Sequence, residues 1–138
     1  MKHMDKVTID PAKNDSAPPL SQGVINYSPQ LFISGQLGLD PTTGRLVTTS
    51  TEAQIRQAFA NFSAVVQSAP GGGGRTTLAD VLKMNIYMAD MAHYSIVNNV
   101  MRDYFGHNGP FPARSAIGVA SLNGAVIEID GIVQLRSY

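Results

Sequence analysis

The sequence predicts an α+β fold in which two helices cover one mixed sheet of about six strands. Two observations lead to this class. Apolar residues recur at a period of two near both ends of the chain and around residue 84, whereas two segments between them have a helical period. Every strand candidate is also at least half apolar, as a sheet packed against helices requires. The predicted order is β-β-β-α-β-α-β-β.

The size and composition indicate one domain that associates with other copies. At 138 residues the chain can bury a single core, so we expect one domain over residues 1–138, with residues 1–18 forming a short strand and a loop. Met1 to Met4 resemble a cloning scar, and His3 is given no role. Charged residues make up only 14% of the chain. This low charge predicts that part of the surface is hidden between subunits.

The charge balance and the missing cysteines exclude several functional classes. Ten basic and ten acidic residues cancel, and no basic cluster occurs, which argues against a nucleic-acid partner. The absence of cysteine excludes disulfides, thiolate metal ligands and a thiol nucleophile. No apolar stretch approaches the roughly 18 residues that cross a bilayer, and no signal peptide is evident. We therefore expect a cytoplasmic protein without a membrane partner.

The first predicted elements are strands separated by proline-rich turns. Residues 5–9 alternate like a short strand, and residues 10–18 are rich in proline and turn formers. Residues 24–40 are rich in β-branched and aromatic side chains, and Pro29 divides them into two strands. The sequence "DPTTG" over residues 40–44 is typical of a turn.

The spacing of apolar residues predicts a helix over residues 50–68. Thr49 and Glu52 form a capping-box pattern at its start, and Pro70 ends it. The apolar stripe consists of Ile55, Phe59, Phe62 and Val66. The glycines of residues 71–74 that follow are interpreted as a loop, because a phosphate-binding loop needs a preceding strand and a following lysine.

Residues 78–90 begin with a single turn and continue as a strand. Its buried face is predicted to consist of Leu82, Met84, Ile86 and Met88. A second helix follows, capped by Asp90, and its apolar stripe is predicted to consist of Tyr94, Val97, Met101 and Tyr104 or Phe105. Asn123-Gly124 lies between two alternating runs and predicts a closing hairpin.

Common catalytic and metal-binding patterns are absent from the sequence. His93 and His107 lie 14 positions apart without a second ligand at a suitable spacing, so we expect solvated or capping histidines and no metal site. A Ser-His-Asp triad stays open in principle, but no Gly-x-Ser-x-Gly elbow occurs. Ser34 lies in a strand pattern, and Gly35 indicates a bulge or a close approach of backbone, which a ligand would also require.

Arg114 and Glu128 are the strongest candidates for chemistry. Arg114 opens the first strand of the predicted hairpin and Glu128 lies in the second, where Val126, Glu128 and Asp130 share one side. Position 128 would pair near residue 119, several rungs from Arg114. Two interpretations stay open at this point. The pair is a strand-edge ion pair worth about 1 kcal/mol or less, or Arg114 binds a ligand carboxylate while Glu128 places a water or proton beside it.

Three stretches resemble the reactive-intermediate deaminase family, the Rid or YjgF proteins, also catalogued as translation inhibitors or endoribonucleases. They are "SGQLGLDPTTGRLV", "PFPARSAI" and "VIEIDGIV", and the similarity runs from about Pro19 to the C-terminus. The resemblance implies a chorismate-mutase-like fold assembled as a homotrimer, with sites between subunits. It implies hydrolysis of an enamine or 2-imino acid to a keto acid and ammonia, without a cofactor.

The resemblance also implies roles for single residues. Arg114 would grip the substrate carboxylate and Glu128 would orient the attacking water. The remaining implied positions line the pocket: Ser34, Gly35, Tyr87, Asn98, Ala116 and Leu20. At Leu20 the family usually has a tyrosine, and at Ala116 it often has a cysteine that acts through its backbone.

The leucine at position 20 makes the implied pocket more apolar and leaves alternatives. The substrate could be an intermediate of aromatic catabolism such as 2-aminomuconate, or the protein could be a non-catalytic trimer that binds small carboxylates. Ribonuclease activity fits poorly, because the net charge is zero and no histidine pair suited to RNA cleavage is evident.

Overall fold

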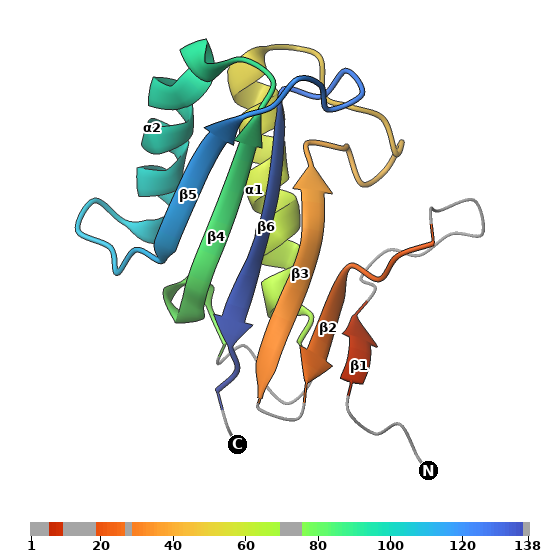
Figure 1. Ribbon diagram of the computed structural model, residues 1–138, viewed down its shortest axis with the longest axis vertical. Coiled ribbons are helices and arrows are strands. Elements are labelled where there is room, and N and C mark those ends of the chain that lie inside the picture. Colours follow the sequence, from red (N-terminus) through yellow and green to blue (C-terminus); the bar gives the residue numbers. More distant parts are fainter. Residues whose placement is uncertain (1–5, 10–18, 27–28, 70–75, 137–138) are drawn as a thin grey trace.

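The fold is one twisted sheet with both helices on the same face. The computed structural model describes residues 6–9, 19–26, 29–69 and 76–136. Figure 1 shows α1 and α2 behind the sheet, and no helix of the described residues covers the other face. The α+β class and the predicted order of strands and helices are confirmed.

Six strands form the sheet in the order β1-β2-β3-β6-β4-β5. Neighbouring strands are antiparallel except β4 and β5, which are parallel, so the sheet is mixed. Their bounds are β1 Lys6–Ile9, β2 Gly23–Asn26, β3 Gln30–Leu37, β4 Val81–Met88, β5 Ala113–Gly118 and β6 Ile127–Gln134. The strand predicted over residues 5–9 and the two strands around Pro29 are confirmed. The loops expected over residues 10–18 and 71–74 lie outside the described residues.

The two helices begin at capped turns. Helix α1 spans Thr51–Gln67, and its N-cap is Ser50, whose hydroxyl accepts a hydrogen bond from the Ala53 N–H. The predicted cap at Thr49 is therefore displaced by one residue. Asp90 caps a short 3-10 turn, Met91–His93, that leads into α2, Tyr94–Phe105. Neither described helix has the length and apolar character that a bilayer span requires.

The core lies between the helices and the covered face of the sheet. Its fully buried side chains include Ile55, Phe59 and Phe62 from α1, Val97 and Val100 from α2, and Met84, Ile86, Ile127 and Ile129 from the sheet. A Cβ at Gly131 would lie 2.9 Å from the ring of Phe62, so the missing side chain lets this ring pack on the strand. The stripe predicted for α1 is confirmed.

The predicted hairpin between the last two strands is wrong. Strand β5 pairs with β4 only, and β6 lies between β3 and β4. Asn123 and Gly124 do form a tight turn, with φ values of 54° and 89°. That turn redirects the chain within the connection from β5 to β6, because the apolar face of β6 is buried best at the centre of the sheet. Glu128 consequently pairs with Leu37 and Tyr87, and the pairing expected near residue 119 does not occur.

Leu82 does not share the buried face of β4. The register of β4 against β6 shifts between Val81 and Lys83, which indicates a bulge. Val81 is buried, whereas Leu82 is 44% exposed and the alternation resumes at Met84. The period-two pattern predicted the wrong face for Leu82, because the extra residue of the bulge reverses which face of the sheet the preceding side chains point to.

Candidate active site

Arg114 lies in the edge strand β5, on the side of the sheet that the helices cover. Its Cα partner in β4 is Met84, whose side chain is fully buried beneath the helices. Residues opposite one another in a sheet face the same way, so the Arg114 side chain extends toward α2. The strand at the edge leaves the guanidinium half-buried.

The Arg114 guanidinium is held by neutral groups of α2. Its Nη1 donates to Asn98 Oδ1 at 2.7 Å and to the Met101 sulfur at 3.4 Å. Its Nη2 donates to the Tyr94 hydroxyl at 3.0 Å, and the guanidinium carbon lies 5.5 Å from the centre of the Tyr94 ring. Within the described ranges no carboxylate forms an ion pair with Arg114. The arginine is therefore oriented without being neutralised.

The sequence contained a signal for all three of these partners. Tyr94, Asn98 and Met101 are spaced by four and three residues, which places them on one side of a helix. We predicted Tyr94 and Met101 for the buried stripe of α2 instead. Met101 is buried, but Tyr94 is 40% exposed and contacts Arg114.

Glu128 lies on the uncovered face of the sheet, over a glycine. The buried residues of β6 alternate with Glu128 and Asp130, as predicted. A Cβ at Gly35 would lie 2.7 Å from Glu128 Cδ and 3.0 Å from Oε1. The register of β3 against β6 shifts between Ile33 and Gln36. The bulge expected at Gly35 is confirmed, and the group that lies close above this glycine is the Glu128 side chain rather than backbone.

The segment that precedes β2 is tied to this bulge. The Ser34 hydroxyl donates to the Ser21 carbonyl oxygen at 2.5 Å, and the Ser34 N–H donates to the Gln22 carbonyl oxygen at 2.8 Å. Leu20 precedes this pair of contacts, and its side chain is 52% exposed. The chain around Leu20 is therefore anchored beside Ser34 and Gly35.

Tyr87 and Asp130 extend the polar cluster beside Glu128. Tyr87 lies directly opposite Glu128 in the β4–β6 register. Its hydroxyl donates to Asp130 Oδ2 at 3.0 Å, and Asn85 Nδ2 donates to Asp130 Oδ1 at 2.8 Å. Burial, this hydrogen bond and the charges of Asp130 and Glu128 together raise the pKa of Tyr87. Sequence reasoning did not identify Asp130 and Asn85 as partners of Tyr87.

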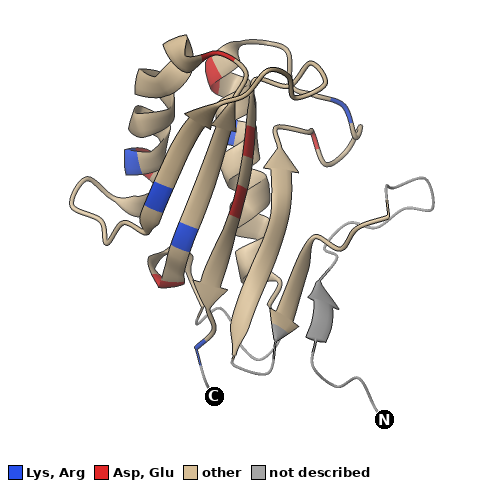
Figure 2. Ribbon diagram, in the orientation of Figure 1, with Lys and Arg blue, Asp and Glu red and all other residues tan. Residues whose placement is uncertain are grey.

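One chain does not bring the two groups of candidate residues together. Arg114 and Asn98 lie on the covered side of the sheet edge, whereas Glu128, Gly35 and Tyr87 lie on the uncovered face. Figure 2 shows the basic residue of β5 and the acidic residues of β6 on separate strands, with β4 between them. Ala116 lies two residues beyond Arg114 in β5 and packs against the core. The strand-edge ion pair between Arg114 and Glu128 does not form.

The other candidate features carry no comparable arrangement. His93 is half-buried at the start of α2, and its side chain makes no capping hydrogen bond, which corrects our expectation of a solvated or capping histidine. His107 is exposed, as expected. Asp103 forms an ion pair with Arg56 at 2.9 Å. A cavity of about 600 Å³ lies between the C-terminal ends of both helices, and its described lining, which includes Thr76, Thr77 and Tyr104, has no acidic or basic side chain.

Comparison with known proteins identifies close relatives over nearly the whole chain. The sequence model described as endoribonuclease L-PSP matches residues 12–135. A protein of Dermatophagoides farinae named 2-iminobutanoate/2-iminopropanoate deaminase is 37% identical over 119 residues, which cover 86% of this chain and 87% of that protein.

Solved structures agree with this match. The Rid-family protein YyfA of Yersinia pestis, a protein of unknown function, superposes with a TM-score of 0.82 at 32% identity, covering 94% of this chain and 99% of that one. The TdcF protein of E. coli, solved with bound serine, superposes with a TM-score of 0.79 at 26% identity, covering 95% and 99%.

Proposed function

We propose that this chain, which belongs to the endoribonuclease L-PSP family of Rid and YjgF proteins, is a deaminase that hydrolyses small 2-imino acids and their enamine tautomers to 2-keto acids and ammonia. Relatives that are 34–37% identical carry the name 2-iminobutanoate/2-iminopropanoate deaminase. The observation that carries the proposal is the Arg114 guanidinium, whose partners among the described residues are all neutral.

Arg114 is suited to bind the carboxylate of such a substrate. Asn98 and Tyr94 fix the direction of the guanidinium but leave its positive charge uncompensated. Charge-assisted hydrogen bonds to a carboxylate contribute about 1.5–3 kcal/mol each. The bound serine of the TdcF protein also carries a carboxylate. A 2-imino acid would be anchored at this end, with its imine carbon directed away from Arg114.

Glu128 is suited to activate water. Its carboxylate accepts a proton from the water while the water oxygen forms a bond to the imine carbon, and the electron pair of the C=N double bond moves to nitrogen. The resulting carbinolamine breaks its C–N bond as nitrogen takes up the proton held by Glu128 and leaves as ammonia, while the hydroxyl group loses its proton to solvent. The carbonyl of the 2-keto acid forms in the same step. A cofactor is not needed, because the protonated imine carbon is already electrophilic.

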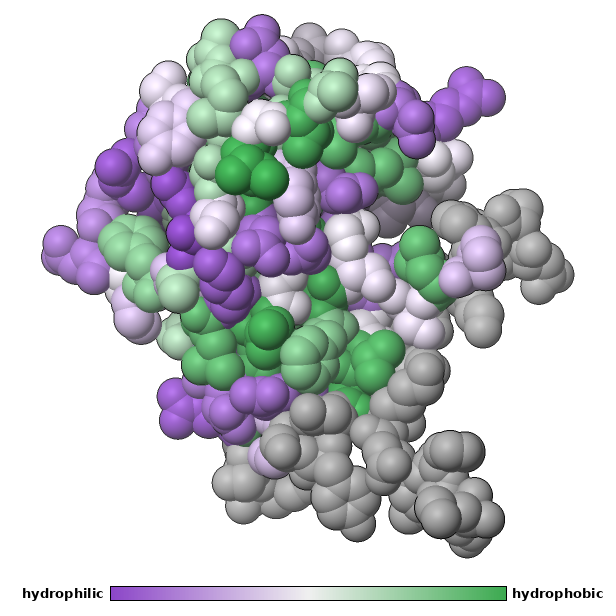
Figure 3. Space-filling view, viewed as in Figure 1, coloured by the Kyte–Doolittle hydropathy of each residue, from purple (hydrophilic) through white to green (hydrophobic). Residues whose placement is uncertain are grey.

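The separation of Arg114 and Glu128 supports a site shared between subunits. We infer a homotrimer of the chorismate-mutase-like type, in which the β5 edge of one copy meets the uncovered face of the next. That face carries apolar side chains between its polar ones, including Phe32 at 37% and Ile117 at 48% exposure. Figure 3 shows hydrophobic surface gathered over this face beside hydrophilic surface. Contact with another copy would bury these side chains. We also propose that the whole chain acts as one domain.

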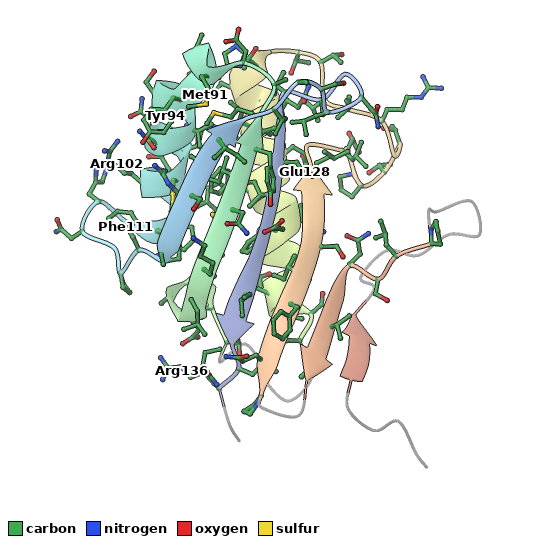
Figure 4. The ribbon with its side chains drawn as sticks, in the orientation of Figure 1. Met91, Tyr94, Arg102, Phe111, Glu128 and Arg136 are labelled. Atoms are coloured by element: carbon green, nitrogen blue, oxygen red, sulfur yellow. The ribbon has the colours of Figure 1, made fainter. Side chains whose placement is uncertain are left out.

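The test is turnover of an imino acid generated in solution. An amino-acid oxidase acting on 2-aminobutanoate supplies 2-iminobutanoate, and its decay is followed with and without the protein. We expect acceleration by the wild type and at least a hundredfold loss of it in Arg114→Ala and in Glu128→Gln. Arg102→Ala is the matched control, since Arg102 is an exposed arginine of α2 that contacts Asn99 (Figure 4). Wild-type decay no faster than buffer would rule out the deaminase.

A non-catalytic carboxylate-binding trimer is the second candidate. The exposed apolar side chain of Leu20 favours it, because this residue offers no hydrogen bond to a small imine. A thermal shift with 2-oxobutanoate that Arg114→Ala abolishes, without any turnover, would favour this binder. Turnover of 2-aminomuconate in preference to 2-iminobutanoate would instead favour the aromatic-catabolism substrate.

A further inference from the structure

Tyr94 contacts Arg114 but has no role in the mechanism proposed for Arg114 and Glu128. It begins α2, and Figure 4 shows it beside β5. Its phenol oxygen accepts a hydrogen bond from Arg114 Nη2 at 3.0 Å. The hydroxyl therefore lies next to the nitrogen that would face a bound carboxylate, and 40% of the residue is exposed to an incoming ligand.

The phenol proton of Tyr94 is not used within the described part of the chain. The two other tyrosines whose side chains are described both donate theirs: Tyr87 to Asp130 at 3.0 Å and Tyr104 to the Arg56 carbonyl oxygen at 3.3 Å. Tyr94 accepts from Arg114, and no described group accepts from Tyr94. A hydroxyl that accepts from a guanidinium is polarised and becomes a stronger donor.

We propose that Tyr94 is a substrate-binding residue that donates its phenol proton to the same carboxylate that Arg114 binds. The inference rests on the proposed function, and it assigns the second donor of the anion site to a residue of α2 four positions before Asn98. Met101 has no proton to donate, and Asn98 contacts the other terminal nitrogen of Arg114. The ligand class is a small organic carboxylate, and the phenol adds a directed neutral donor to the charged one.

Tyr94→Phe distinguishes the contribution of the hydroxyl to ligand binding from the contribution of the ring. Phenylalanine keeps an aromatic ring over the guanidinium at the place where Tyr94 now lies 5.5 Å from it, and it removes only the donor. Tyr104→Phe is the matched control, because it removes a phenol near the end of α2 that donates to the Arg56 carbonyl oxygen of α1. The ligand for binding is 2-oxobutanoate, and the corresponding neutral amide, 2-oxobutanamide, reports contacts that do not involve the carboxylate.

We expect Tyr94→Phe to weaken 2-oxobutanoate binding about tenfold by calorimetry, with binding of the amide and the Tyr104→Phe control both within twofold of the wild type. In turnover, KM for 2-iminobutanoate should rise by the same factor while kcat changes little. Binding of 2-oxobutanoate by Tyr94→Phe as tight as by the wild type would overturn the inference.

Two further outcomes are decisive. If the Arg114 Nε–H resonance shows that the guanidinium becomes mobile in free Tyr94→Phe, the tyrosine acts through Arg114 and the direct contact is refuted. An unchanged resonance together with weaker binding supports the direct contact. Should the wild type bind 2-oxobutanoate through Tyr94 without hydrolysing any imino acid, the deaminase proposal fails while the carboxylate site stands.

Discussion

The two faces of the sheet are built for different purposes. On the covered face, Met84, Ile86 and Ile129 are fully buried by the helices of the same chain. On the uncovered face, Asn85, Tyr87 and Asp130 form a hydrogen-bonded cluster, and exposed apolar side chains flank it. The side chains of the covered face are thus buried by contacts within one chain. The uncovered face holds Glu128 and Tyr87, and in the proposed trimer Arg114 of a second copy would complete the site.

The first and largest test of this difference uses two isoleucines of β6. Ile129 is fully buried on the covered face, and Ile132 is half-buried on the other face. We expect Ile129→Ala to lower the free energy of unfolding by about 2–5 kcal/mol at every protein concentration. Ile132→Ala should cost much less, and only where copies associate. Urea unfolding at several protein concentrations measures both. Equal, concentration-independent costs would contradict the distinction between the faces.

Gly35→Ala should disable the uncovered face without unfolding the protein. The new Cβ would lie 2.7 Å from Glu128 Cδ, and the glutamate side chain can move away because it is partly exposed. We expect kcat/KM for 2-iminobutanoate to fall about a hundredfold, since Glu128 no longer places the water, with the unfolding midpoint nearly unchanged. Gly44→Ala in the exposed turn serves as a glycine control for activity, although its φ of 71° will cost some stability. Full activity of Gly35→Ala would mean that Glu128 does not place the water in the reaction.

Asn98→Asp tests whether ligand binding requires that the positive charge of Arg114 is not neutralised by a protein carboxylate. An aspartate in the place of Asn98 Oδ1, 2.7 Å from Nη1, would pair with the guanidinium and compete with a ligand carboxylate. We expect the Kd for 2-oxobutanoate to rise at least about tenfold. Asn99→Asp makes the same change of charge at the next, exposed residue and should alter Kd less than twofold. Similar Kd values for both variants would mean that the charge of Arg114 does not bind the ligand.

The smallest expected effect concerns the pH dependence of Tyr87. Burial and the hydrogen bond to Asp130 raise the pKa of Tyr87 above its ordinary 10.0, so folding favours the neutral phenol. This contribution is complete below pH 10 and is lost as the pH rises from 10 through the higher pKa of the folded state. The stability of the wild type relative to Tyr87→Phe should therefore fall between pH 9 and 11. We expect a change within about 0.5 kcal/mol, because the site is partly solvated. Urea unfolding measures this difference in the free energy of unfolding. A rise in the difference between pH 9 and 11 would contradict a raised pKa of Tyr87.

Most of the fold could be predicted because it follows from local periodicity. The helical spacing of Phe59 and Phe62 and the alternation of Ile127 and Ile129 report which side is buried, and the structure agrees. Strand order was not accessible in this way. Asn123 and Gly124 adopt the backbone of a tight turn, yet the strands on either side pair elsewhere, since partner choice depends on the whole sheet. The bulge at Leu82 was missed because one inserted residue leaves no compositional trace.

The candidate site was predictable by residue type but not by arrangement. The bulge at Gly35 was expected, but the close contact there comes from the Glu128 side chain and not from backbone. The hydrogen bond from Arg114 to Asn98 depends on β5 lying beside α2, which the predicted hairpin did not provide. Tyr94 was assigned to the core because an aromatic residue at helical spacing has the same pattern whether it packs inside or contacts a charge.

The central place of β6 affects how the protein can be made. Strands β3 and β4 have no direct ladder with each other and are joined through β6 alone. While a ribosome is still adding the residues after Val126, the nascent chain holds two half-sheets, each with an unsatisfied edge. The edges of β3 and β4 can therefore pair only after β6 has been synthesised. Until then both edges are open to aggregation, and chaperones would have to protect them.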